Sequence, residues 1–395
     1  MTSKWKTSPL RDLVGFISKG IAPSYTDEES ETTVRVLNQK CNRNFQITYS
    51  ESRLHDLSRK KVPVERFVRI DDILINSTGA GTAGRIAQIC NLPCDTIVDG
   101  HMIIIRANNK VSQKYLGYAM KAHQWEVLQL DEGSTGQTEL NRERLLDEIM
   151  VSYPTSFALQ EMIVKTLEGI DRKLLINEKV NDNLQQQSFI FFDRLMIEAD
   201  NNDGIVSDYA DLNPRRVLTK HQIARSIDMS QLSTSGAFPS GWEMKPFNGG
   251  MRFANGDTLL ARITPCLENG KTAFIDFLDE GEVAFGSTEY IVLAPRKDVP
   301  SEMLYCLARY PAFVDYAVKN MNGSSGRQRV SAETIGQFRL PKFDEQSLLK
   351  FGEAVKPMFL KMRYNSLENI RLAELRDALL PKLMSGEIDV SGIQL

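Results

Sequence analysis

The sequence of 395 residues has few of the features that mark several large protein classes. It has no run of the roughly 18 apolar residues that a membrane helix needs, and its first residues lack an apolar core, so we expect a cytoplasmic protein. Its five cysteines include no Cys-x-x-Cys pair, which argues against a disulfide framework and a common zinc site. With 48 basic and 51 acidic residues, the net charge of −3 argues against a histone-like nucleic-acid binder.

The sequence repeats itself once. At a constant spacing, the segment 177–196 matches 365–384, so that Asn177 aligns with Asn365 and Leu184 with Leu372. Two further pairs of segments match upstream of these: 133–145 with 323–335, and 71–85 with 256–271. Three matches at similar spacings indicate that the chain contains two copies of one unit, each a mixed region with glycine turns followed by a long helical segment.

The two helical segments carry matching heptad patterns. Each places two asparagines at the same position of its apolar seam, where buried amides fix the register and the partner of a coiled coil. We expect Leu184, Phe191, Leu372 and Leu379 to be seam residues. We also expect Pro357 to kink or restart the second helix. The alternative is that the two helices belong to unrelated cores, since apolar heptads alone are common.

Sequence patterns typical of enzymes are weak here. Gly79, Gly81 and Gly84 form a Gly-x-Gly-x-x-Gly pattern, but the strand-like segment 85–90 follows it, so a glycine-rich hairpin is favoured over a nucleotide site. Cys90, Cys94, Asp99 and His101 resemble a metal cluster only loosely, because the second copy has no equivalent ligands. No histidine lies in a recognisable nucleophile motif. We therefore expect neither catalysis nor a bound metal or cofactor in this chain.

Two similar globular units separated by long helices are suited to an extended ligand that is contacted at two places. DNA fits this geometry, because half-sites one helical turn apart are roughly 34 to 36 Å from each other. Arg, Gln, Asn, Ser and Thr, which contact base edges and phosphates, concentrate at the repeated turns. The sequence therefore favours a DNA-binding function.

The chain resembles the DNA-specificity (S) subunits of type I restriction–modification systems. Residues 375–389, LRDALLPKLMSGEID, are similar to the C-terminal signature of that family, and the repeated Gly-Ser-[Ser/Thr]-Gly turn is similar as well. The resemblance covers essentially the whole chain, including its duplication. One departure is that the first helix has Phe191 to Leu195 where the second has Leu379 to Leu383, so the first copy of the signature is degenerate.

The resemblance implies an α+β fold with two target-recognition domains, separated by two long helices that pack as an antiparallel coiled coil with a pseudo-two-fold duplication. The expected boundaries are 1–155 for the first domain, 156–198 for the central helix, 199–341 for the second domain and 342–395 for the C-terminal helix and tail. Each domain would bind one half of a bipartite, asymmetric site in double-stranded DNA. The implied partners are two methyltransferase subunits, docked on the outer faces of the helices, and restriction/translocase subunits. S-adenosylmethionine and ATP with Mg²⁺ would be bound by those partners.

The residues that we expect to contact DNA lie on tight turns, where polar side chains reach base edges and glycine lets the backbone approach phosphate. In the first domain they are Asn76, Ser77, Thr78, Gly79, Ser134, Thr135, Gly136, Gln137 and Arg142. In the second domain they are Arg262, which aligns with Ser77, and Ser324, Ser325, Gly326, Arg327 and Gln328. The alternative is that the glycine turns are purely structural. The run Arg59 to Lys61 is either a phosphate contact or a solvated charge cluster.

Two other functions remain open. A duplicated, non-catalytic scaffold would bind only proteins through its coiled coil, and a small-molecule transferase would use the loop 79–84. No region of the chain is strongly basic, so we expect the isolated chain to bind DNA modestly and partner subunits to supply phosphate contacts.

Overall fold

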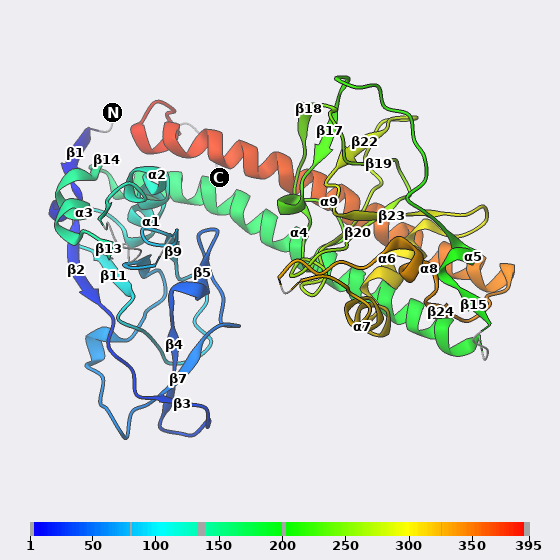
Figure 1. Cartoon of the computed structure of the whole chain (residues 1–395). Coiled ribbons are helices and arrows are strands. Elements are labelled where there is room, and N and C mark those ends of the chain that lie inside the picture. Colours follow the sequence, from blue (N-terminus) through cyan, green and yellow to red (C-terminus); the bar gives the residue numbers. More distant parts are fainter. Residues whose placement is uncertain (1–3, 80, 133–138, 200–202, 325, 391–395) are drawn as a thin grey trace. The chain divides into compact units, whose positions relative to one another are not determined.

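The computed structural model describes residues 4–79, 81–132, 139–199, 203–324 and 326–390. The chain divides into two compact units: unit 1 is Met1–Asp171 with Leu375–Leu395, and unit 2 is Arg172–Glu374. Each unit contains one sheet-rich region and part of both long helices, α4 (Phe157–Glu198) and α9 (Glu345–Ser385) (Figure 1). The mixed α+β fold expected from the sequence is therefore confirmed.

Unit 1 contains two four-stranded sheets. One is antiparallel with the order β2-β11-β8-β9, and the other has the order β10-β4-β7-β3, in which β10 and β4 are parallel. The strands are β2 (Val14–Lys19), β3 (Tyr25–Thr26), β4 (Thr33–Leu37), β7 (Arg53–Asp56), β8 (Ile73–Asn76), β9 (Ile86–Gln88), β10 (Thr96–Val98) and β11 (Met102–Ala107). Three two-stranded pairs also occur among the described residues of this unit: β1 (Trp5–Pro9) with β14 (Met150–Pro154), β5 (Asn42–Arg43) with β6 (Gln46–Ile47), and β12 (Asp131–Glu132) with β13 (Glu139–Leu140).

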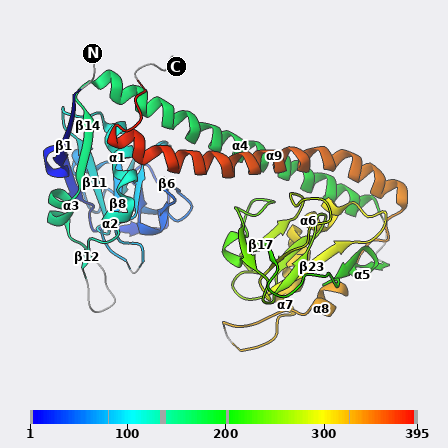
Figure 2. The same cartoon turned by 90° about the horizontal axis from the view of Figure 1, so that it is seen from above.

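The apolar runs of unit 1 form strands that are buried on both faces. Side chains alternate across a strand, so Ile73 and Ile75 face the cluster that includes α1 (Gln113–Ala122), whereas Leu74 between them faces the smaller core shared with the second sheet. Helix α1 packs on β9 and β11, and Figure 2 shows it beside β11. Two further helices belong to this unit: α2 (Gln124–Val127) and α3 (Arg142–Glu148).

Unit 2 repeats this architecture. Its sheets have the orders β16-β23-β20-β21 and β18-β17-β22-β19, and β17 and β22 are parallel as β4 and β10 are in unit 1. The strands are β16 (Ala210–Leu212), β17 (Ile223–Ile227), β18 (Glu243–Pro246), β19 (Met251–Phe253), β20 (Thr258–Ala261), β21 (Thr272–Phe274), β22 (Ala284–Gly286) and β23 (Tyr290–Pro295), with the pair β15 (Gly204–Ile205) and β24 (Arg339–Leu340). The helices are α5 (Val206–Tyr209), α6 (Ser301–Arg309), α7 (Pro311–Lys319) and α8 (Ala332–Gly336). The units differ at the edge of the second sheet, where β19 pairs with β22 but β3 pairs with β7.

The segment after β8 is a hairpin, as the sequence predicts. Strands β8 and β9 pair antiparallel with Ile73 opposite Gln88, and the connecting residues Gly79 and Gly84 have positive φ angles of 115° and 82°. Because only glycine adopts such angles without strain, the glycines are explained by the backbone of the turn.

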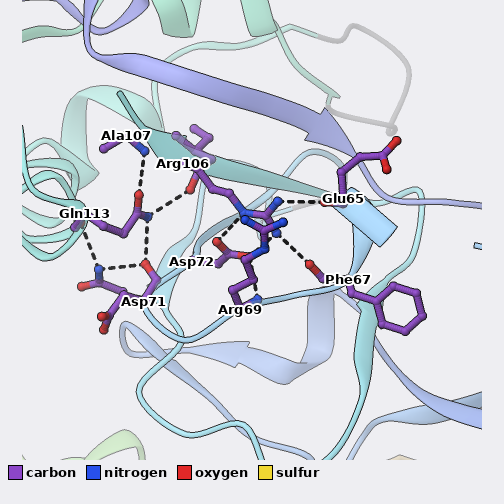
Figure 3. A network of polar contacts seen from close by, with 10 residues as sticks. Glu65, Phe67, Arg69, Asp71, Asp72, Arg106, Ala107 and Gln113 are labelled. Carbon is purple, nitrogen blue, oxygen red and sulfur yellow. Dashed lines mark hydrogen bonds and ion pairs between the residues drawn. The ribbon is translucent and has the colours of Figure 1, made fainter. Parts of the chain in front are cut away.

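A buried ion pair fixes the start of β8 (Figure 3). Asp72 accepts hydrogen bonds from Nε and Nη2 of Arg106 on β11, both at 2.7 Å, and from the backbone N–H of Arg69 at 2.8 Å. The guanidinium also donates to the carbonyl oxygens of Glu65 and Phe67. This network joins β8, β11 and the segment before β8 into one rigid support.

Unit 2 has a similar support at the start of β20. Asp257 is 1% exposed and accepts two hydrogen bonds from Nη2 of Arg216, at 2.5 and 2.7 Å, and one from the backbone N–H of Ala254. Asp72 and Asp257 occupy the same place in the two copies, but their arginine partners come from different segments. The duplication therefore preserved the buried carboxylate and its backbone contact while the cation changed position.

The two long helices run antiparallel within each unit. In unit 2, Asn177 of α4 contacts Asn369 of α9, and Phe192, further along α4, contacts the earlier residue Phe351. In unit 1, Ile163 and Leu167 of α4 share a core cluster with Leu380, Leu383 and Met384 of α9.

Helix α9 continues through Pro357, which corrects the expectation of an interruption there. Val355 and Phe359, on either side of the proline, are at most 1% exposed in the core of unit 2. Their burial offsets the backbone hydrogen bond that the proline cannot donate.

No helix among the described residues is long and apolar enough to cross a membrane. The five cysteines are free thiols. In the described part of the chain, no group of three or more His, Cys, Asp or Glu side chains is placed to hold a metal ion.

Candidate functional site

In unit 1, three segments meet where β8 ends. The backbone N–H of Ser77 donates to the carbonyl oxygen of His101 at 2.8 Å, and the N–H of Leu140 donates to the carbonyl oxygen of Ser77 at 2.7 Å. These bonds join the end of β8, the turn before β11 and the segment that enters α3. We call this arrangement the junction of unit 1.

The same junction occurs in unit 2. The N–H of Arg262 donates to the carbonyl oxygen of Glu289, and the N–H of Val330 donates to the carbonyl oxygen of Arg262, both at 3.0 Å. Arg262 therefore occupies the backbone position of Ser77, as the alignment of the two copies predicts, and Glu289 occupies that of His101. One backbone frame thus presents different side chains in the two units.

The predicted contact residues of unit 1 differ in their accessibility. Asn76 and Ser77 have no exposed surface, so neither side chain can reach a ligand in this structure. The amide of Asn76 instead donates to the carbonyl oxygen of Gln39 at 3.1 Å and accepts from Asn42 at 3.2 Å. Their burial has a physical reason: Asn76 joins the segment 39–42 to the end of β8, and Ser77 forms the backbone hydrogen bonds of the junction.

Thr78 and Arg142 are the accessible members of the predicted set. The hydroxyl of Thr78 lies 2.7 Å from Nδ1 of His101, and Arg142 is an exposed residue in the first turn of α3 with Glu143 at 3.6 Å. Gly79 forms the turn described above. The predicted residues Ser134, Thr135, Gly136 and Gln137 lie outside the described residues.

In unit 2 the predicted contact residues that the structure describes are more exposed to solvent than Asn76 and Ser77 are in unit 1. Ser324 and Arg327 are exposed, Gln328 is partly buried, and Gly326 has a positive φ of 79°. Arg262 is partly buried, and its Nε is a buried donor with no partner among the described residues. Ser325 lies outside the described residues.

A tight ion pair organises the charges at the junction of unit 2. Arg329 donates to both carboxylate oxygens of Glu289, with N to O distances between 2.7 and 3.0 Å. These hydrogen bonds, together with the charge of nearby Arg262, hold the pKa of Glu289 below its usual value. Because Arg329 is held by this pair, Arg262 and Arg327 are the cations of the junction best placed to meet an anionic ligand.

A pocket adjoins the junction of unit 1, and the sequence-based prediction did not include it. It has a volume of about 490 Å³ and is lined by Tyr25, Asn38, Gln39, Lys40, Ser50, Glu51, Ser52, Arg53, Asp99 and His101. These residues belong to four segments that are distant in the sequence, so no local motif marks them. The hydrogen bond between His101 and Thr78 connects the pocket to the hairpin after β8.

The helix pair of unit 2 contains a layer of four asparagines. Asn177 donates to Oδ1 of Asn369 and Asn365 donates to Oδ1 of Asn181, both at 2.8 Å. Asn177 and Asn365 are 2% and 1% exposed. Both expected pairs of seam asparagines therefore meet in the interior of the helix pair.

Three of the four residues chosen for the apolar seam are partly buried in the structure. Leu184 packs against the core of unit 2, Leu379 packs against that of unit 1, and Leu372 is partly buried. Phe191 is 36% exposed, whereas its neighbour Phe192 is 1% exposed and packs edge-on against Phe351. The seam advances by four residues rather than three after Ser188, because consecutive turns of an α-helix take 3.6 residues.

Comparison with known proteins gives similarities of sequence and of fold. Residues 2–186 match the family described as Type I restriction modification DNA specificity domain. The type I restriction enzyme EcoAI specificity subunit of Escherichia coli is 34% identical over 128 residues, which are 31% of this chain and 21% of that protein. The HindI specificity subunit of Haemophilus influenzae is 21% identical over 308 residues, covering 58% of this chain and 67% of that protein.

A solved structure resembles the whole chain in fold. The type I restriction–modification S subunit of M. genitalium superposes with a TM-score of 0.58 at 14% identity, covering 99% of this chain and 98% of that one. The matched segments span only 21% and 24% of the EcoAI and EcoEI subunits of Escherichia coli. The sequence matches therefore concern one part of those proteins, and the similarity over full length is one of fold.

Proposed function

We propose that the chain is the DNA-recognition subunit of a type I restriction–modification complex, because residues 2–186 match the family described as Type I restriction modification DNA specificity domain. In this proposal each sheet-rich region binds one half of a bipartite, asymmetric site. The observation that carries it is the duplicated junction, whose common backbone frame places Thr78 beside His101 in one unit and Arg262 beside Glu289 in the other. Two domains that share this backbone arrangement but carry different side chains at it are suited to bind different DNA sequences.

The net charge of the chain determines the affinity for DNA that we propose. Its net charge is −3, and much of the affinity of any protein for DNA comes from cations that neutralise phosphates. Among the cations of the junctions, Arg329 is already paired with a carboxylate. The isolated chain should therefore bind DNA modestly, and partner subunits should contribute phosphate contacts.

The helices are the proposed docking site for two methyltransferase subunits. Apolar side chains remain exposed on α4 in unit 2, including Ile176 at 46%, Ile190 at 66% and Phe191 at 36%. Burying such side chains in an interface is favourable by roughly 25 cal/mol per Å² of apolar surface. Restriction/translocase subunits complete the proposed complex.

The proposal assigns no chemistry to this chain. As a specificity subunit it is not an enzyme, and methylation and ATP-driven cleavage are proposed to reside in the partners. Those partners would bind S-adenosylmethionine and ATP with Mg²⁺.

The test is co-expression of the chain with the type I methyltransferase subunit of its host, followed by mapping of methylated adenines by single-molecule sequencing. We expect one asymmetric motif made of two short specified blocks around an unspecified gap. A stable complex without any motif would favour the alternative, a duplicated scaffold that binds only proteins. Failure to form a complex would contradict the proposed partners.

A further inference from the structure

Asp99 lies at the wall of the pocket of unit 1. It is only 5% exposed, and it precedes β11 in the turn that ends at His101. Its Oδ1 accepts the backbone N–H of His101 at 2.9 Å. The described residues provide no hydrogen-bond partner for its other oxygen, Oδ2. Asp99 is thus a buried carboxylate with one oxygen committed to the turn and one available to the pocket.

The turn itself does not require a carboxylate. In unit 2 the corresponding residue is Ser287, whose hydroxyl oxygen accepts the backbone N–H of Glu289 at 3.1 Å. A neutral acceptor therefore caps the same turn in the second copy. Burying a carboxylate without a cation is costly, and the pKa of Asp99 is raised by this desolvation. The buried carboxylate of Asp99 costs stability and is not needed for the turn, which indicates that it binds a ligand.

Other polar and charged groups of the pocket indicate which chemical groups the ligand carries. Oε1 of Gln39 is a second buried acceptor without a hydrogen-bond partner among the described residues. The guanidinium of Arg53 lies 3.6 Å from the centre of the Tyr25 ring, which makes a flat cationic edge at the pocket, and Lys40 is exposed beside it. Buried acceptors together with exposed cations in the lining suit a group that donates hydrogen bonds and is attached to a phosphate chain.

Nucleobases combine these properties. In the major groove, cytosine N4 and adenine N6 are exocyclic amino groups that donate hydrogen bonds, whereas guanine O6 and thymine O4 accept them. A carboxylate oxygen attracts the first pair and repels the second. The phosphates that flank the base would meet Lys40 and Arg53.

We propose that this pocket is a base-recognition pocket of unit 1, in which Oδ2 of Asp99 accepts a hydrogen bond from the exocyclic amino group of a cytosine or adenine in the first half-site. The inference rests on the proposed function. It assigns base specificity to Asp99 and Gln39, beside the hairpin, and leaves Asn76 and Ser77 as supports of the junction.

Two substitutions separate the role of Asp99 in recognition from its role in the turn. Asp99→Asn keeps the oxygen that accepts the His101 N–H and replaces Oδ2 with an amino group. Asp99→Ser reproduces the residue that caps the equivalent turn in unit 2. A matched control is Asp95→Asn, because Asp95 is an exposed residue just before β10 and does not line the pocket.

Each variant is co-expressed with the methyltransferase subunits, and its methylation motif is compared with that of the unchanged chain. We expect Asp99→Asn to alter one position of the first block, with at least a tenfold loss of preference for the amino-bearing base and a gain for guanine or thymine. Asp99→Ser should relax the same position to several bases. The second block, and the whole motif of Asp95→Asn, should be unchanged.

The outcomes distinguish this inference from the proposed function. If the unchanged chain yields no motif, DNA recognition itself fails. If it yields a motif that both Asp99 variants retain in full, the pocket assignment is overturned while DNA recognition stands. If Asp99→Ser abolishes folding, as judged by its melting temperature, the carboxylate is structural and the inference is equally overturned.

A second measurement tests whether the pocket binds a base in duplex DNA or a free nucleotide. The purified chain is titrated with cytidine and adenosine monophosphates and, separately, with duplexes that contain the mapped motif. We expect the motif duplex to raise the melting temperature and the free nucleotides to have no effect at the same concentration. Stabilisation by free nucleotides, lost in Asp99→Ser without a change of motif, would show a soluble nucleotide site and would overturn the assignment to DNA.

Discussion

Asn177 of α4 donates a hydrogen bond to Oδ1 of Asn369 of α9 over 2.8 Å, and Asn369 is the counterpart of Asn181 in the duplicated sequence. The reciprocal bond runs from Asn365, the counterpart of Asn177, to Asn181. The symmetry extends to the backbone, because Asn181 donates to the carbonyl oxygen of Met362 and Asn369 donates to that of Leu174. A local pseudo-two-fold axis therefore passes through the helix pair at this layer, and polar groups that must be satisfied fix its register.

We predict that Asn181→Leu lowers the free energy of unfolding by about 1 to 3 kcal/mol, although leucine is the better helix former. The substitution removes the acceptor of the buried Asn365 amide, whose Oδ1 already has no partner among the described residues. The measurement is urea denaturation of the purified chain. Asn183→Leu is the matched control, because Asn183 is exposed on the same helix and its replacement should cost little. Equal effects of the two substitutions would contradict a role for the layer in stability.

Neighbouring phenylalanines of α4 should behave in opposite ways. Phe192 is 1% exposed and packs against Tyr310 and Phe351, so Phe192→Ala should cost about 3 to 5 kcal/mol of stability. Phe191 is 36% exposed, so Phe191→Ala should change stability by less than about 1 kcal/mol. If the proposed docking face is right, Phe191→Ala should instead weaken co-purification with the methyltransferase subunit. Thermal unfolding and pull-down yields of both variants test the pair together.

The buried ion pair of unit 1 leads to a third prediction. Arg106→Met leaves the carboxylate of Asp72, 2% exposed, without its cation and should lower stability by about 3 to 5 kcal/mol. The double variant Arg106→Met with Asp72→Asn should recover part of that loss, because the uncompensated charge is gone. The check is a double-mutant cycle by chemical denaturation. Purely additive effects would show that the two side chains act independently.

The stability that the ion pair at the junction of unit 2 contributes should depend on pH. The hydrogen bonds from Arg329 lower the pKa of Glu289 in the folded chain, so its ionised form is favoured by folding. For a carboxyl whose native pKa lies below the unfolded value of about 4.3, the stabilisation is complete above that value and is lost as the pH falls through the native pKa. The melting temperature of Glu289→Gln should therefore lie below that of the unchanged chain at pH 7. The difference should shrink as the pH falls below about 4. A difference that stays constant with pH would show that the charge of Glu289 is not responsible.

The sequence predicted the features that depend on its own repetition and periodicity. Matching segments located the duplication, the two long helices and the equivalence of Ser77 with Arg262, because each follows from the order of residue types along the chain and needs no knowledge of tertiary contacts. The glycine hairpin was predictable for the same reason: positive φ angles at Gly79 and Gly84 are a local demand of the backbone.

Features that arise from tertiary contacts were not predictable. Asn76 and Ser77 have the residue types of a binding turn, but the junction buries them against segments far away in the sequence. Phe191 and Phe192 are equally apolar, and only the packing of Phe351 and Tyr310 decides which of them faces the core. The pocket at Asp99 draws its walls from four separate segments. The comparison of Asp99 with its counterpart Ser287 marks it, since a charge stands where the second copy has a hydroxyl, but that pairing follows from the strand registers of Met102 with Asn76 and of Tyr290 with Ala261.

Substitution of Arg327 tests DNA recognition by unit 2 directly. Its side chain is exposed, whereas the neighbouring Arg329 is held by both oxygens of Glu289. Arg327→Ala should therefore leave the melting temperature unchanged and relax or abolish one block of the methylation motif. The expected loss of discrimination is about 1 to 3 kcal/mol, or roughly 5-fold to 150-fold, if the guanidinium contacts a guanine. Arg329→Ala is the informative companion, because it should lower stability by releasing Glu289 as well as affecting the motif. A full, unaltered motif from Arg327→Ala would remove this arginine from the recognition surface and leave Arg262 as its principal cation.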